Sequence, residues 1–217
     1  MEKLNNIDTW VFDMDNTLYD YDQRVLERMA VAMIKFIEKT LNVSEEEANR
    51  LRVFYLKTYG TTLNGLMKEY NIKPADFVQG YLDIDISHVT KADLIIDTLK
   101  KIDGRKFIFT NSSREFTARM TKQLGIENCF DAIFCVEDME FIAKPSHEAY
   151  LKFIDYTGIN PKTSCMFEDT LENLEVPHQL GMKTVWIYGE SPHKDIELPY
   201  VDYRTERLSH CLHKLAL

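Results

Sequence analysis

Short apolar runs alternate with helical patterns along most of the chain, and this alternation limits the fold more than any other feature. The runs have the length of strands buried on both faces, and they span residues 7–12, 106–109, 132–136, 164–167 and 184–187. Helical patterns between the later runs close at Gly125, Gly158 and Gly181, where helix ends favour glycine. Alternating strands and helices build parallel sheets, so we expect a doubly wound α/β core.

The segment 20–89 departs from this alternation because nothing in it resembles a strand. Ser44 and Glu47 form a capping box, and Gly60 ends the helix that it opens. Helices are predicted over residues 21–41, 45–59, 62–70 and 74–82, and a further one over 91–102 returns to the core. We therefore expect a core of residues 1–19 and 90–217 and an inserted all-helical cap of residues 20–89, with hinges near Tyr19–Asp22 and Ser87–Thr90.

Composition excludes several classes of protein. The chain has 217 residues with 26 Lys plus Arg against 35 Asp plus Glu, a net charge of −9, which disfavours binding to nucleic acid polymers. It has no long apolar run for a membrane span and no basic-then-apolar leader. The four cysteines form no C-x-x-C pair, so disulfide and zinc frameworks are not expected. These features predict a cytoplasmic protein without membrane partners.

The first apolar run ends in the pattern Asp13-x-Asp15-x-Thr17. Ligands of open α/β sheets bind at the carboxyl ends of the strands, so the position suits a functional site. If the chain turns after Asp13, for which Asn16 and Thr17 are suitable residues, one carboxylate can attack an electrophile while the other transfers protons. The pattern also arises by chance, and it gains weight only from residues elsewhere in the chain.

Three further strands are followed by polar side chains of matching chemistry: Thr110 with Asn111, Lys144, and the pair Glu168 and Asp169. Each has an ordinary alternative, since Thr110 could cap a helix, Lys144 could be solvated, and the two acids could stabilise a helix start. Together with Asp13 and Asp15, the acids place four carboxylates at one sheet edge, where they would repel unless a cation joined them. Oxygen ligands and a phosphate-like substrate favour Mg²⁺.

These motifs resemble the haloacid dehalogenase superfamily, and in particular its phosphatases with a helical, C1-type cap inserted into a Rossmann-like core. The segments 45–52, 59–63, 13–19 and 105–111 also resemble the pyrimidine 5′-nucleotidase subgroup. Members of that subgroup often carry an acidic residue and a histidine after the Thr-Asn pair, where this chain has Ser113 and Phe116.

The resemblance implies a role for each residue of the motifs. Asp13 would be the nucleophile that forms an aspartyl-phosphate, and Asp15 the general acid and base. Mg²⁺ would be held by the Asp13 carboxylate, the Asp15 backbone carbonyl and Asp169, with Glu168 binding directly or through water. Phosphoryl oxygens would be bound by Lys144, Thr110 and the backbone N–H groups near Met14 and Asn111.

Tyr59-Gly60-Thr61-Thr62 interrupts the helical cap with hydroxyl groups that we expect to be exposed. A cap must present side chains to the leaving group, so Tyr59 and Thr61 are candidates for substrate binding. The alternative is that Tyr59 belongs to the packed interior of the cap together with Phe54 and Tyr55.

The sequence thus predicts a Mg²⁺-dependent phosphomonoester hydrolase of small phosphorylated metabolites, most of all of pyrimidine nucleoside 5′-monophosphates. A sugar-phosphate phosphatase or phosphomutase of the same superfamily is the main alternative. A haloacid dehalogenase fits less well, since attack on carbon needs no acidic cluster, and a non-catalytic binding protein would be expected to have lost Asp13 or Lys144. We expect a monomer or a small homo-oligomer.

Overall fold

Six parallel strands form one sheet in the order β3-β2-β1-β4-β5-β6. The computed structural model describes residue 4 and residues 6–215, with side chains up to Cys211. The strands are β1 (Thr9–Phe12), β2 (Arg105–Phe109), β3 (Ala132–Phe134), β4 (Ser164–Glu168), β5 (Lys183–Ile187) and β6 (Tyr203–Thr205). The predicted doubly wound parallel sheet is confirmed.

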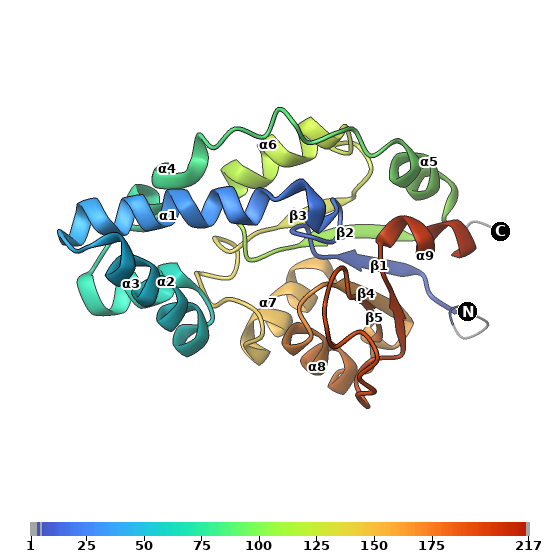
Figure 1. Cartoon of the computed structure of the whole chain (residues 1–217). Coiled ribbons are helices and arrows are strands. Elements are labelled where there is room, and N and C mark those ends of the chain that lie inside the picture. The colour runs from blue at the N-terminus through green and yellow to red at the C-terminus, as the bar shows by residue number, and fades with distance from the viewer. Residues whose placement is uncertain (1–3, 5, 216–217) are drawn as a thin grey trace. The chain divides into compact units, whose positions relative to one another are not determined.

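Helices cover both faces of this sheet (Figure 1). From β1 the chain passes to β2 and β3 on one side, then crosses to β4 and β5 on the other. Right-handed crossovers in opposite directions put the connecting helices on opposite faces. Accordingly, one face carries α5 (Asp93–Lys101), α6 (Arg114–Leu124) and α9 (Leu208–Leu215), and the other carries α7 (His147–Thr157) and α8 (Glu172–Gln179); the short η3 (Pro161–Thr163) precedes β4. The strand order reverses between β1 and β4, where such sheets bind ligands.

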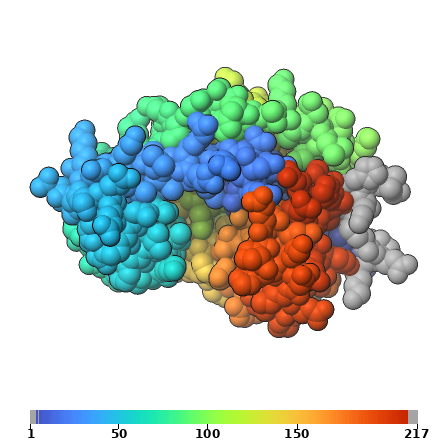
Figure 2. Space-filling model, viewed as in Figure 1, coloured from blue at the N-terminus to red at the C-terminus, as the bar shows by residue number. Residues whose placement is uncertain are grey.

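The chain divides into two compact units, one of residues 1–23 with 89–217 and one of residues 24–88. The second unit consists of α1 (Val25–Leu41), α2 (Glu45–Tyr59), α3 (Thr62–Tyr70) and α4 (Pro74–Leu82). Ser44 caps α2 as predicted, its hydroxyl accepting from the Glu47 N–H. Helices α2 and α3 pack closely, and a Cβ atom at Gly65 would lie 2.2 Å from the Tyr55 ring. The atoms of this unit are coloured blue to cyan in the space-filling view (Figure 2).

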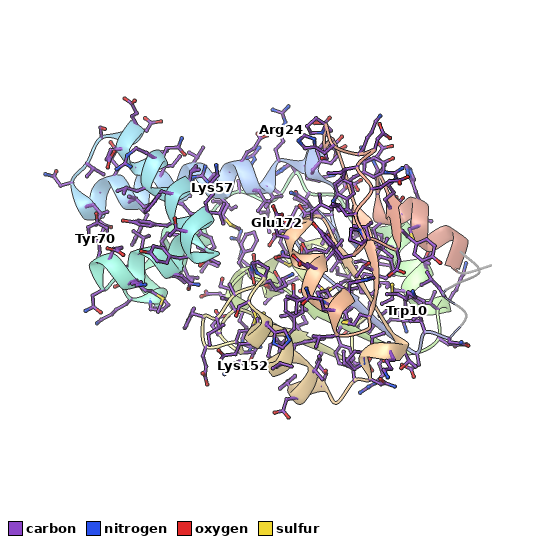
Figure 3. All side chains as sticks on the ribbon, turned by 90° about the horizontal axis from the view of Figure 1, so that it is seen from below. Trp10, Arg24, Lys57, Tyr70, Lys152 and Glu172 are labelled. Atoms are coloured by element: carbon purple, nitrogen blue, oxygen red, sulfur yellow. The ribbon has the colours of Figure 1, made fainter. Side chains whose placement is uncertain are left out.

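The helix predicted over 21–41 is broken at its start. Residues Tyr21–Gln23 form a separate 3-10 turn, η2. Arg24, labelled in Figure 3, has a left-handed backbone, with φ of 52°. Asp20 and Asp22 both accept hydrogen bonds from Arg207, which ties this segment to the sheet-containing unit. The left-handed backbone of Arg24 interrupts the right-handed helical geometry, so η2 and α1 do not form one continuous helix.

Three other element boundaries differ from the predictions by two residues, and the remaining differences are of one residue. The third strand ends at Phe134 rather than Val136 because the Cys135 N–H donates to Asp138 Oδ2 at 2.8 Å. Helix α5 begins at Asp93, after the Ala92 N–H bonds to the Leu124 carbonyl. The first strand begins at Thr9, after the Ile7 N–H bonds to the Leu4 carbonyl. Strand β6 was not predicted. Within the described residues, every helix is too short or too polar to cross a membrane.

Candidate functional site

The carboxyl ends of β1 and β4 lie side by side and bring two predicted site residues together. Phe12 of β1 is in register with Phe167 of β4, and the Asp13 N–H donates to the Phe167 carbonyl at 2.9 Å. Asp13 therefore lies beside Glu168 at the point where the strand order reverses. Both side chains are buried, Asp13 being 5% exposed and Glu168 1%.

Lys144 is the cation of this site, and it is 1% exposed. Its Nζ donates to Asp13 Oδ1 at 2.8 Å, to Glu168 Oε2 at 2.7 Å and to the Phe109 carbonyl at 2.8 Å. Burial disfavours the ammonium, but the charges of Asp13 and Glu168 outweigh it and raise the pKa of Lys144 above its ordinary value. All three N–H groups are engaged, so this arrangement makes Lys144 primarily a partner of the two carboxylates.

The Asn111 side chain fixes the backbone of Lys144. Its Nδ2 donates to the Lys144 carbonyl at 3.0 Å, and its Oδ1 accepts from the Lys144 N–H at 2.9 Å. This pair of hydrogen bonds joins the end of β2 to the loop before α7. The sequence suggested only the backbone N–H near Asn111 as a functional group. The two hydrogen bonds between the Asn111 side-chain amide and the Lys144 backbone were not predicted.

Asp13, Glu168 and Asp169 form an acidic group whose potential ligand oxygens all lie within 4.8 Å of one another. Burial, and next the charge of Glu168, raises the pKa of Asp13 well above its usual range, and the same two causes raise that of Asp169. Lys144 supplies one positive charge against these three carboxylates. The remaining negative charge and the hard oxygen donors fit a divalent cation such as Mg²⁺.

The Asp15 carboxylate lies outside that group of three and is held by two hydroxyls. Tyr19 donates to its Oδ1 and Ser112 to its Oδ2, both at 2.5 Å. Burial raises the pKa of Asp15, although these two hydrogen bonds act in the opposite direction. A buried carboxyl with a raised pKa is suited to donating a proton. Neither hydroxyl was recognised as a site residue from the sequence.

The turn after Asp15 has the geometry that its sequence predicts. Asn16 adopts a left-handed backbone with φ of 55°, which asparagine tolerates. The buried Met14 accepts at its carbonyl from the N–H groups of Thr17 and Leu18. The Asn16 amide also donates to Asp169 Oδ2 at 3.2 Å, which connects the first loop to the acidic pair after β4.

Thr110 is buried at the end of β2, as are Ser112 and Ser113. The Thr110 hydroxyl accepts from the Ser112 N–H at 3.0 Å and retains its own hydrogen for donation. Ser113 caps α6 by accepting from the Phe116 N–H, and the Phe116 ring is fully buried. The two positions that differ from the nucleotidase subgroup thus serve helix capping and core packing.

Tyr59 and Thr61 belong to the helical unit and have partners within it. The Tyr59 hydroxyl donates to Glu69 at 2.6 Å, and the Thr61 hydroxyl caps α3 by accepting from the Asn64 N–H. Thr62, expected to be exposed, is 6% exposed and donates to the Arg52 carbonyl. That expectation was wrong because Thr62 begins α3 on the face packed against α2.

The sequence pattern of the haloacid dehalogenase-like hydrolases matches residues 10–187. A protein of Saccharomyces cerevisiae named Phosphate metabolism protein 8 is 29% identical over 187 residues, which cover 79% of this chain and 58% of the yeast protein. The chain thus spans less than two thirds of the length of that relative.

Solved structures share the fold over nearly their whole length. A HAD phosphatase from Thermococcus onnurineus has a TM-score of 0.67 at 19% identity, covering 96% of this chain and 98% of its own. CbbY from Rhodobacter sphaeroides, in complex with phosphate, has a TM-score of 0.67 at 19% identity, covering 97% and 100%. An L-2-haloacid dehalogenase from Xanthobacter autotrophicus with covalently bound chloropropionic acid has a TM-score of 0.61 at 16% identity, covering 95% and 97%.

At these identities the solved structures establish the fold and leave the substrate open, since phosphatases and dehalogenases share it. The family pattern, in contrast, extends from β1 to the end of β5 and includes Asp13, Thr110, Lys144 and Asp169. The chain therefore belongs to the haloacid dehalogenase-like hydrolase family.

Proposed function

We propose that this chain is a phosphomonoester hydrolase that uses Asp13 as its nucleophile. The observation that carries the proposal is the buried Asp13 carboxylate, 2.8 Å from Lys144 Nζ and beside Glu168 and Asp169. A carboxylate among like charges is reactive only if positive charge offsets them, as a phosphate-transfer site requires. The neighbouring Asp15, with its raised pKa, supports the proton transfers of such a hydrolase.

The reaction proceeds in two steps. An Asp13 oxygen bonds to phosphorus while the bond from phosphorus to the leaving oxygen breaks, and Asp15 gives its proton to that oxygen. A water molecule then attacks phosphorus, its proton passes to Asp15, and the bond between Asp13 and phosphorus breaks. Lys144 keeps Asp13 oriented and offsets its charge throughout.

Asp13, Glu168 and Asp169 would hold Mg²⁺. When bound, the ion supplies positive charge for the nucleophile and the transferred phosphoryl group. Glu168 Oε2 already accepts from Lys144, and its Oε1 from the Thr170 N–H at 3.2 Å. The hydrogen bonds that Asp169 accepts from Asn16 and Thr170 are both 3.2 Å long, so its oxygens are held less tightly than those of Glu168 and can turn to a metal.

Metal dependence tests this assignment. EDTA should abolish phosphate release and Mg²⁺ restore it, and Asp169→Asn should raise the Mg²⁺ concentration for half-maximal activity by about tenfold or more. Mg²⁺ should also raise the Tm of the unmodified protein more than that of the variant. The control is Glu172→Gln, which changes an exposed acid at the start of α8 (Figure 3). Equal Mg²⁺ requirements of Asp169→Asn and the control would contradict the assignment.

For the substrate we propose a pyrimidine nucleoside 5′-monophosphate. The support is the resemblance of the nucleophile loop, the β2 end and the α2–α3 region to that subgroup of phosphatases. Phosphate in the CbbY structure and the name of the yeast relative support small phosphorylated substrates in general. Tyr59 and Thr61 are the proposed specificity residues of the helical unit.

A substrate panel tests the proposal: UMP, CMP, dTMP, AMP, a hexose phosphate and pyridoxal phosphate. We expect kcat/KM for UMP or CMP to exceed that for AMP by about tenfold or more, and Tyr59→Phe to reduce this ratio. Thr61→Ala would also remove the α3 cap, so Thr61→Ser serves as the variant that keeps the cap. A preference for hexose phosphate would instead indicate a sugar phosphatase. Activation of the enzyme by a sugar bisphosphate would indicate a phosphomutase.

A further inference from the structure

The two oxygens of the Asp15 carboxylate are held by two hydroxyls, one from the same loop and one from a distant part of the sequence. Tyr19, in the same loop, donates to Oδ1, and Ser112, from the end of β2, donates to Oδ2; each distance is 2.5 Å. Hydrogen bonds to an ionised carboxylate are short and strong. With one donor on each oxygen, the carboxylate cannot rotate without losing one of them.

Tyr19 is fixed on both sides along the chain and is 3% exposed. Before it, the Leu18 N–H donates to the Met14 carbonyl at 3.0 Å, which closes the turn. After it, Asp20 accepts a hydrogen bond from Arg207 of the same unit. The tyrosine hydroxyl therefore points at Asp15 from a backbone that the core unit anchors.

Ser112 is fixed in a similar way and is 9% exposed. Its N–H donates to the Thr110 hydroxyl at 3.0 Å, and its carbonyl accepts from the Val136 N–H at 3.3 Å. The serine hydroxyl thus has its direction set by the end of β2 and by the loop after β3. Two rigid, independent supports converge on one side chain.

We propose that Tyr19 and Ser112 are positioning residues that hold the Asp15 carboxylate in the orientation from which it exchanges protons with the substrate and with water. This inference rests on the proposed phosphatase function and deepens it. Proton transfer depends on the direction and distance of the donor, so a carboxylate that can rotate loses rate even where it remains present.

Single hydroxyl deletions give the first test. Tyr19→Phe and Ser112→Ala should each lower kcat/KM for UMP about tenfold, the worth of one hydrogen bond to a charged group. With 4-nitrophenyl phosphate the loss should stay below about threefold, because nitrophenolate leaves without a proton. The inhibition constant of inorganic phosphate should not change. Ser112→Thr, which retains the hydroxyl, should recover most of the UMP activity.

Tyr150→Phe is the matched control. Tyr150 is as buried as Tyr19, and its hydroxyl donates at 2.6 Å to the Asn173 carbonyl rather than to Asp15. Loss of this hydroxyl should leave the ratio of UMP to 4-nitrophenyl phosphate turnover unchanged, even if it lowers stability.

A double-mutant cycle gives the decisive test. If Tyr19 acts through Asp15, Tyr19→Phe should cost less than about twofold in an Asp15→Asn background, where no proton is transferred. Ser112→Ala should likewise cost less than about twofold in the Asp15→Asn background. It takes the place of Tyr19→Phe in this test if that variant does not fold. If the unmodified enzyme is active and Tyr19→Phe costs the same activity in both backgrounds, the inference is overturned while the proposed function stands. If the unmodified enzyme releases no phosphate from any substrate, the proposed function fails and the inference fails with it.

Discussion

Replacing Lys144 by methionine is expected to slow turnover at least about 100-fold and to lower the free energy of unfolding by about 3–5 kcal/mol. Methionine keeps most of the volume but removes the charge that three hydrogen bonds hold between Asp13, Glu168 and the Phe109 carbonyl. Two buried carboxylates then lack their cation, and such unpaired charges are among the most destabilising changes known in protein interiors. Urea denaturation in EDTA measures the loss of stability.

Lys152→Met provides the control for this experiment. Lys152 lies on α7 (Figure 3). It pairs with Glu140 at 3.0 Å, and its side chain is 27% exposed. Partly exposed ion pairs contribute little, so this variant should change stability by less than about 1 kcal/mol. Adding Asp13→Asn to Lys144→Met should restore part of the lost stability, because it removes one of the unpaired acids. A Lys144→Met protein as stable as the control would contradict this account of the site.

Asp13→Asn should reduce turnover by about 10⁴-fold or more while leaving the protein at least as stable as before. The amide has the size of the carboxylate but cannot form the acyl-phosphate bond. Burial and the charge of Glu168 raise the pKa of Asp13, so its charged form is disfavoured in the folded state. At neutral pH, above the ordinary pKa of aspartate, that shift is a cost to stability which the neutral variant avoids.

The two readouts of Asp13→Asn separate catalysis from folding. Steady-state phosphate release measures the first and urea denaturation the second. Suppose that Asp13→Asn lowered the free energy of unfolding by more than about 1 kcal/mol. The ion pair between Asp13 and Lys144 would then stabilise the unmodified protein by more than the burial of the Asp13 charge costs, contrary to the direction of the Asp13 pKa shift. Stability gained where activity is lost is the pattern expected of a functional carboxylate.

The position of the site was predictable because local sequence encodes it. A buried parallel strand is a continuous apolar run, so the first polar residue after it marks the carboxyl edge of the sheet. Asp13 and Glu168 lie at such ends, and the pairing of Phe12 with Phe167 makes them neighbours. The turn at Asn16 was likewise readable from a residue type that tolerates a left-handed backbone.

The partners of these residues depend on contacts that local sequence does not encode. Ser112 reaches Asp15 only because β1 and β2 are adjacent and the loop after β2 folds over the first loop. The side-chain amide of Asn111 fixes the backbone of Lys144, whose ammonium makes the three hydrogen bonds of the site. The contact between Asn111 and Lys144 is likewise long-range in sequence. Tyr19 did leave a signal, since it follows Asp15 by four residues across a turn, but a large aromatic side chain is equally typical of a core position.

Two errors in the fold have similar causes. The break at Arg24 comes directly after Asp20 and Asp22, which bond to Arg207 near the other end of the chain, and local sequence does not encode such a contact. Strand β6 has three residues, and its parallel pairing with Val185–Ile187 of β5 defines it. A segment this short carries too little periodicity to be recognised without its neighbour.

The most direct test of the central claim is to find the phosphoryl group on the enzyme during turnover. The protein is mixed with UMP and Mg²⁺, quenched in acid within milliseconds, digested, and analysed by mass spectrometry. We expect one phosphoryl group on the peptide that contains Asp13, and none on the same peptide of Asp13→Asn. Steady release of phosphate with no phosphorylated Asp13, or with the group on another residue, would contradict the account.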